Sequence, residues 1–185
     1  MTNKERFLNL CAQIKREGIN DLIAFLEASD FFEAPASTRY HGSYAGGLLE
    51  HSLNVYDELK RLLTIYPEIK VSEETIIIVA LFHDLCKVYM YSTEKRNRKN
   101  SAGQWESYDA YTHAEKFNYG GHGSKSVFLV QKYIKLTDEE AVSINCHMGS
   151  WDGNTSVGAA YEQFPLAWAL HVADEGATYL RDGKS

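Results

Sequence analysis

The stretch "EETIIIVALFHDLCKVYMY", residues 73–91, decides the predicted fold. Its apolar residues go almost all the way round a helix, which is typical of a helix buried at the centre of a bundle. Ser72 is a plausible N-cap, and acidic residues occupy the first turn. His83 and Asp84 lie side by side in this apolar context. A buried carboxylate without a partner is costly, so the sequence predicts that other groups neutralise them.

The segments on either side of this stretch also have helical spacing. We expect helices in residues 3–18, 20–29, 48–66, 124–136, 137–149 and 164–180, with Asn20 and Thr137 as N-caps. Residues 34–47 are predicted as a loop, and the polar residues 92–121 as a long loop or a short hairpin. No strand pattern persists. The predicted fold is therefore all-α, one domain over 1–185 with N-terminal helices in 1–39 and a core in 40–181.

Composition limits the class of protein. The 185 residues are 44% hydrophobic and 24% charged, which is ordinary for a globular protein. The net charge of −6 argues against a protein that coats nucleic acid through a basic surface, but not against a local phosphate site. Cys11, Cys86 and Cys146 form no CxxC pair and are expected to be reduced. The longest apolar run, 76–82, is too short to span a bilayer. We therefore expect a cytoplasmic protein without a membrane partner.

Metal-binding residue types recur at five places along the chain. They are His51, the pair His83 and Asp84, His122, His147 and Asp174. All but His122 fall inside predicted helices, and His122 opens one. Helices that cross in a bundle bring such ligands together from distant sequence, and a metal ion makes a buried charge tolerable. The mixed nitrogen and oxygen donors favour Mn, Fe, Co, Ni or Zn over an all-oxygen Mg site.

The ordered pattern H…HD…H…H…D resembles the HD superfamily of metal-dependent phosphohydrolases. It is carried by "GGLLEHSLNV", "ALFHDLCKV", "GGHGSKSV", "INCHMGSWD" and "ALHVADEGATYL", over residues 40–181. The segment "YHGSYAGGLLEH" is similar to the HD module of bacterial 3′–5′ exoribonucleases, whose preceding OB-type domain we do not expect to find room for here. The part from "EKFNYGGHGSKSV" to "HMGSWD" looks like small standalone HD hydrolases of bacteria and phages.

This resemblance implies a site with two divalent metal ions. His51, His83, Asp84 and Asp174 would hold one ion, and Asp84 would bridge to a second ion held by His122 and His147. Lys87 matches the lysine of the family's HD-x-x-K pattern and is expected to contact a substrate phosphate. The implied activity is hydrolysis of a phosphoester or phosphoanhydride in a nucleotide or a short nucleic acid.

Several residues near these motifs have more than one interpretation. His41 could protonate a leaving group or contact phosphate, or it could be an ordinary loop residue. His171 could replace Asp174 as a ligand, although a packed partner is favoured. His147 could cap helix carbonyls, and an exposed His122 would leave one metal ion. Lys125 and Asp152 are further predicted substrate contacts.

Other predictions are weaker. A basic cluster, Lys95, Arg96, Arg98 and Lys99, is more typical of a solvated charge run than of a phosphate-docking surface. Aromatic residues near the expected cleft could stack on a base or simply pack: Trp105, Tyr108, Tyr111, Phe117, Tyr119 and Trp151. An apolar surface could support a homodimer. Two alternative functions are a di-iron HD-type oxygenase and a non-catalytic nucleotide-binding HD module.

Overall fold

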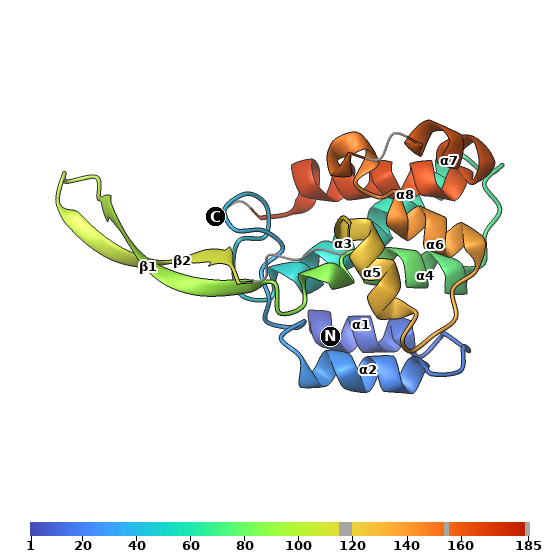
Figure 1. Ribbon diagram of the computed structural model, residues 1–185, viewed down its shortest axis with the longest axis horizontal. Coiled ribbons are helices and arrows are strands. Elements are labelled where there is room, and N and C mark those ends of the chain that lie inside the picture. Colours follow the sequence, from blue (N-terminus) through green and yellow to red (C-terminus); the bar gives the residue numbers. More distant parts are fainter. Residues whose placement is uncertain (115–119, 154–155, 184–185) are drawn as a thin grey trace.

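The computed structural model describes residues 1–114, 120–153 and 156–183, and it shows a helical body from which one β-hairpin projects (Figure 1). Eight α-helices lie in these ranges: α1 Asn3–Cys11, α2 Ile19–Ala28, α3 Gly47–Ile65, α4 Glu73–Phe82, α5 His122–Val130, α6 Asp138–Asn145, α7 Val157–Gln163 and α8 Pro165–Gly176. Short 3₁₀ turns follow at Leu85–Lys87 and Gly149–Asp152, and a π-helical turn at Ala177–Arg181. The prediction of an all-α fold is confirmed, apart from the small hairpin.

Helix α4 forms the centre of the body, as predicted. Every residue from Thr75 to Phe82 is buried, and the helix packs against α1, α3 and α6. The Ser72 hydroxyl accepts a hydrogen bond from the Thr75 backbone N–H at 3.1 Å, which confirms the predicted N-cap. The helix ends at Phe82, however, and not near Tyr91. Asp84 leaves the helical conformation, with φ −105° and ψ 23°, and the chain turns toward the hairpin.

The start of helix α3 depends on close backbone contact with the loop before it. A Cβ atom on Gly47 would lie 2.0 Å from the Gly42 carbonyl oxygen, so only glycine fits there. Gly46 adopts a left-handed φ of 81° just before the first helical residue. These glycines bring the loop with His41 against the helix that carries His51.

Several of the other expected boundaries needed correction: α5 runs from His122 to Val130 and not from 124 to 136, and α6 ends at Asn145 and not at 149. Helix α1 ends at Cys11, and α2 has Gly18 as its N-cap, whereas Asn20 lies inside the helix. Gly18 has a φ of 86°, and a Cβ there would lie 1.9 Å from the Tyr133 carbonyl oxygen. A tertiary contact therefore places this cap. Thr137 caps α6 as predicted, in a capping box with Glu140.

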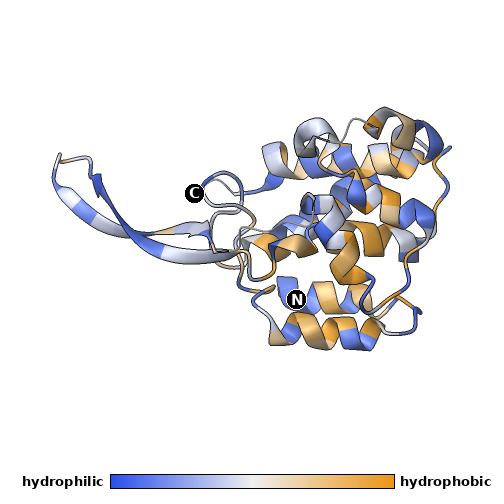
Figure 2. Cartoon of the chain, in the orientation of Figure 1, coloured by the Kyte–Doolittle hydropathy of each residue, from blue (hydrophilic) through white to orange (hydrophobic). Residues whose placement is uncertain are grey.

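The polar region after α4 forms a hairpin with two nine-residue strands, β1 Tyr91–Lys99 and β2 Trp105–His113. The strands are antiparallel, and their register runs from Tyr91 opposite His113 to Lys99 opposite Trp105. Figure 2 shows that this ribbon is mostly hydrophilic, in contrast to the apolar interior of the helical body. Of the two predicted alternatives, a long loop or a short hairpin, the structure shows a hairpin, and its strands are long. Among the described residues, no helix is both long and apolar enough to cross a membrane.

Candidate metal centre

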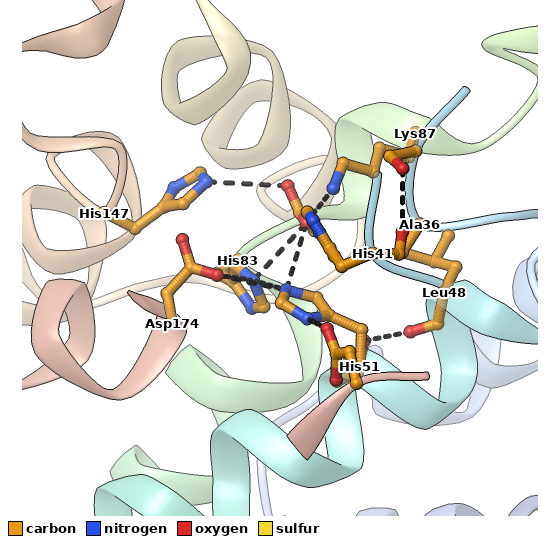
Figure 3. Close-up of polar contacts among 12 residues, drawn as sticks. Ala36, His41, Leu48, His51, His83, Lys87, His147 and Asp174 are labelled. Carbon is orange, nitrogen blue, oxygen red and sulfur yellow. Dashed lines mark hydrogen bonds and ion pairs between the residues drawn. The ribbon is translucent and has the colours of Figure 1, made fainter. Parts of the chain in front are cut away.

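Side chains from four separate segments meet in the buried interior (Figure 3). His51 comes from α3, His83 and Asp84 follow α4, His147 follows α6, and Asp174 comes from α8. All five are buried. The packing of α3 against α4 and α8 brings three of these segments together. Five of the six predicted metal ligands are therefore neighbours in the fold.

The donor atoms have spacings that suit a shared cation. The Nε2 atom of His51 lies 3.2 Å from His83 Nε2 and 3.1 Å from Asp174 Oδ1, while His83 Nε2 lies 3.9 Å from Asp174 Oδ1. Two donors bound at about 2.1 Å to one ion lie about 3.0–3.5 Å apart. His51, His83 and Asp174 thus form one group of ligand atoms that could hold a metal ion.

Asp84 connects this group to a second one. Its Oδ2 atom lies 3.5 Å from the Nε2 atoms of both His51 and His83. Its other oxygen, Oδ1, lies 3.5 Å from His147 Nε2, and His83, Asp84 and His147 form a second group of potential ligand atoms. The two oxygens of one carboxylate therefore face two sets of imidazoles, which is the arrangement of a bridging ligand.

A hydrogen bond to a backbone carbonyl three residues earlier orients two of the imidazoles. His83 Nδ1 lies 2.9 Å from the Ala80 carbonyl oxygen, and His147 Nδ1 lies 2.7 Å from the Ile144 carbonyl oxygen. A carbonyl only accepts, so Nδ1 carries the proton and Nε2 presents its lone pair to the centre. Each carbonyl belongs to the last turn of a helix, three residues before the histidine whose ring N–H donates to it.

His147 gives the clearest fit to a metal. Its Nε2 atom is buried and makes no hydrogen bond to any residue in the described ranges. Asp84 Oδ1 lies 3.5 Å from this atom, a separation that two ligands of one ion would also have. A metal-ligating histidine typically donates its other ring N–H to a carbonyl or carboxylate, as His147 does. The donor set and its orientation therefore fit divalent transition-metal ions.

Charges at the centre keep the carboxylates ionised. Burial alone would raise the pKa of Asp84, but Lys87, whose Nζ lies 2.5 Å from Oδ2, and the neighbouring histidines hold this pKa well below its usual value. Burial would likewise raise the pKa of Asp174, but the hydrogen bond with His51 lowers it. Burial opposes protonation of His51, yet Asp174 and Asp182 raise its pKa to about 9. Metal binding must therefore displace a proton from His51.

Asp182 is a residue of the centre that the sequence motifs did not indicate. Its Oδ2 atom accepts a hydrogen bond from His51 Nδ1 at 2.7 Å, and its Oδ1 atom accepts one from the Asn54 side chain at 2.8 Å. The only local signal was a "DG" dipeptide after the last helical segment, which indicates a turn and not a contact with α3. The return of the chain to His51 is a tertiary feature.

Three predicted residues lie around the centre. Lys87 lies in the 3₁₀ turn and contacts Asp84. The His41 ring lies 5.1 Å from the His51 ring, and burial together with Lys87 lowers the His41 pKa to about 4. His171 Nδ1 donates to the His147 backbone carbonyl at 2.7 Å, which fits the favoured interpretation of a packed partner.

The remaining predictions are placed less directly. His122 is half-buried at the first position of α5 and is outside the groups of potential ligand atoms. Lys125 is buried in the same helix, which is joined to the turn after α4 by a hydrogen bond from Cys86 N to Ser126 Oγ at 3.1 Å. The Asp152 side chain, Phe117 and Tyr119 lie outside the part of the chain that the structure describes. Trp105 and Trp151 are exposed.

Comparison with known proteins agrees with this geometry. A sequence model of the HD domain matches residues 48–179. The chain belongs to the HD domain family. HD domains bind divalent metal ions, and the matched range contains every residue of the two groups around Asp84.

The chain is also similar to a phosphodiesterase. The chain is 30% identical over 123 residues to the dihydroneopterin 2′,3′-cyclic phosphate phosphodiesterase of Methanocaldococcus jannaschii, and the match covers 58% of this chain and 47% of that protein. The chain thus spans about half the length of this relative. No solved structure matches the chain significantly.

Proposed function

We propose that this HD domain is a metal-dependent phosphohydrolase that cleaves a phosphodiester in a nucleotide or a similar phosphorylated small molecule, with short nucleic acids as further candidate substrates. The observation that carries this proposal is the position of Asp84. Its two carboxylate oxygens face different histidines, so the chain offers a bridging ligand with a nitrogen donor on each side. The cyclic phosphodiester named for the archaeal relative supports a phosphodiester as the first substrate class to test.

Each residue of the centre has a role in this proposal. When bound, two divalent ions would supply Lewis acidity and an activated water. His51, His83 and Asp174 would hold one ion, and Asp84 would connect it to the ion held by His147 and, as the sequence predicts, His122. Their fixed orientations would avoid a cost of reorganisation during the reaction.

Two further groups would act on the substrate. Lys87 is the cation in contact with Asp84, and we expect its ammonium group to contact a nonbridging phosphate oxygen. The Nε2 atom of His41 is buried without a hydrogen bond in the described part of the chain. With its pKa lowered to about 4 the ring is neutral near pH 7, and in the tautomer with the proton on Nε2 it would donate a hydrogen bond to the phosphate or to the leaving oxygen without first losing another partner.

The first experiment measures metal content and turnover on the same samples. Elemental analysis of protein purified without added metal should find about two transition-metal ions per chain. The substrates are bis(p-nitrophenyl) phosphate and a set of 2′,3′-cyclic nucleotides, tested with Mn²⁺, Fe²⁺, Co²⁺, Ni²⁺ and Zn²⁺. One ion per chain would remove His122 from the ligand set.

The variant Asp84→Ala should show the largest effect. Loss of the bridging carboxylate should lower turnover by about 10³-fold or more, which corresponds to several kcal/mol of transition-state stabilisation. The exposed Asp109 of the hairpin gives the matched control, Asp109→Ala, which should keep full activity. Full metal-dependent turnover in Asp84→Ala would overturn the proposal. Oxygen consumption that requires iron would favour the alternative of a di-iron oxygenase. Nucleotide binding without turnover would favour the alternative of a non-catalytic binding module.

A further inference from the structure

The carboxylate of Asp182 is buried behind the metal centre. Its side chain is only 2% exposed, although it follows the last helical turn of the described chain. Its two oxygens accept hydrogen bonds from two residues of α3: Oδ2 from His51 Nδ1 at 2.7 Å and Oδ1 from Asn54 Nδ2 at 2.8 Å. His51 and Asn54 are three positions apart and share a helix face, so one carboxylate meets both donors.

The backbone around Asp182 is also fixed. The Asp182 N–H donates to the Ala177 carbonyl at 2.9 Å, which closes the last helical turn. The next carbonyl, that of Gly183, accepts a hydrogen bond from Gly42 N at 3.0 Å, in the loop that carries His41. The chain after α8 therefore returns to the loop of residues 34–47. Asp182 is thus held in place by α3, by the end of α8 and by this loop.

His51 differs from the other two imidazoles of the centre in its partner. His83 and His147 donate Nδ1–H to neutral backbone carbonyls, whereas His51 donates to a carboxylate. A carboxylate partner fixes the ring and makes the opposite nitrogen a stronger electron donor to a metal. That nitrogen, His51 Nε2, lies 3.1–3.5 Å from donor atoms of Asp174, His83 and Asp84. A change in the orientation of the His51 ring would therefore alter the spacing of all the donor atoms in the first group.

We propose that Asp182 is a positioning residue that orients His51 and raises the metal affinity of the group formed by His51, His83 and Asp174. Asn54 supports it by holding the second carboxylate oxygen. This inference rests on the proposed function, because it assumes that the centre binds a divalent ion. Asp182 lies outside the range matched by the HD domain model and outside the ordered motif, so neither assigns it a role.

The test compares Asp182→Ala, Asp182→Asn and Asn54→Ala with the wild type. Metal affinity is measured for Zn²⁺ and Mn²⁺ by titration against a chelator, and the Co²⁺-loaded proteins are compared by visible absorption. Asp182→Ala should weaken binding of the first ion by about 10–100-fold and change the Co²⁺ spectrum. Asp182→Asn should lose less affinity, because its amide oxygen still accepts the His51 N–H. Asn54→Ala should have the smallest effect, and Asp109→Ala none.

The outcomes separate this inference from the proposed function. Failure of the wild type to bind any of these ions would overturn both. Tight binding by the wild type with equal affinity and an unchanged Co²⁺ spectrum in Asp182→Ala would overturn the inference alone, even if the melting temperature falls. If Asp182→Ala does not fold, Asp182→Asn decides: reduced affinity with an altered spectrum supports the positioning role, and wild-type values contradict it.

Discussion

The metal centre and the β-hairpin are both rich in charged side chains, but the charges have different surroundings. Asp84 is buried and lies within 3.5 Å of Lys87, His51, His83 and His147, which come from several segments. Charges on the hairpin pair along or across the ribbon and remain in contact with water, as Lys95 and Asp109 do. Removing a charge should therefore be costly at the centre and nearly neutral on the hairpin.

The Lys87–Asp84 pair should give the larger effect in this comparison. In Lys87→Met the buried Asp84 carboxylate loses its closest cation, so we expect the metal-free protein to lose about 3 kcal/mol of unfolding free energy. Saturating Mn²⁺ should reduce this loss, because bound ions also neutralise Asp84. Turnover should fall by about 10²-fold if Lys87 also contacts the phosphate. Urea unfolding with EDTA and with Mn²⁺ measures the first effect, and steady-state kinetics the second.

The matched control is Lys95→Met on the hairpin. It makes the same substitution at a lysine whose side chain is exposed to water. It should change neither stability nor turnover. An equal loss of stability with and without metal in Lys87→Met would show that Lys87 serves the fold and not the charge balance of the centre. Unchanged turnover would remove Lys87 from the substrate contacts.

A second buried network tests whether the contrast extends beyond the metal centre. Arg16 donates two hydrogen bonds to Glu140, at 2.7 and 2.8 Å, and the Thr75 hydroxyl and Thr137 backbone N–H donate at 2.9 Å each. Burial alone would raise the pKa of Glu140, but these hydrogen bonds lower it. Glu140→Gln should therefore cost roughly 2–3 kcal/mol at pH 7.

The pH dependence of this loss has a definite sign. A carboxyl whose pKa is lower in the folded state stabilises the protein above its unfolded pKa of about 4.3, and this contribution disappears as the pH falls through the folded value. The difference between wild type and Glu140→Gln should thus shrink below about pH 4 in urea unfolding experiments. Burial and the neighbouring Glu140 raise the pKa of Glu139, so Glu139→Gln is the control and should be neutral or slightly stabilising at pH 7. A loss for Glu140→Gln that does not depend on pH would contradict this account.

The sequence predicted much of the centre because its candidate ligands sit in strongly patterned segments. The apolar helix before His83 and the ordered histidines and aspartates indicated five residues that the structure brings together: His51, His83, Asp84, His147 and Asp174. The sequence indicated that His147 could cap carbonyls, but it placed His83 well inside a helix, because periodicity does not show where the helix before it ends. Asp182 was missed for a different reason: its partner lies 131 residues away, and no local pattern encodes that contact.

The hairpin was predicted only in outline. Strands are recognised from alternation between a buried and an exposed face, and nearly every residue of β1 is exposed. Without a core to face, the ribbon has no alternating apolar signal. The predicted N-cap of α2 was wrong for a similar reason. Gly18 caps the helix because the Tyr133 carbonyl leaves no space for a side chain there, and the neighbouring sequence does not show this contact. The domain limits and the roles of all the predicted site residues, including His122, Lys125 and Asp152, stay predictions.

The smallest expected effect concerns the ion pair between Lys95 and Asp109. Their atoms approach to 2.9 Å across the two strands, but the side chains are 70% and 59% exposed. Exposed pairs of this kind contribute about 0–1 kcal/mol, because water solvates the separated charges almost as well. A double-mutant cycle of Lys95→Ala and Asp109→Ala should give a coupling energy of no more than about 0.5 kcal/mol, measured by urea unfolding at pH 7.

The same cycle on Arg16→Ala and Glu140→Ala makes the comparison quantitative, since that pair has similar distances but is only 20% and 0% exposed. We expect its coupling energy to be several times larger and to survive at about 1 M salt, where the hairpin coupling should vanish. If the coupling energy of Lys95 and Asp109 were as large as that of Arg16 and Glu140, the hairpin charges would not be fully exposed to water in solution. The charged faces of the hairpin would then contact something else in solution, and a second copy of the chain would be the first candidate to test by sedimentation.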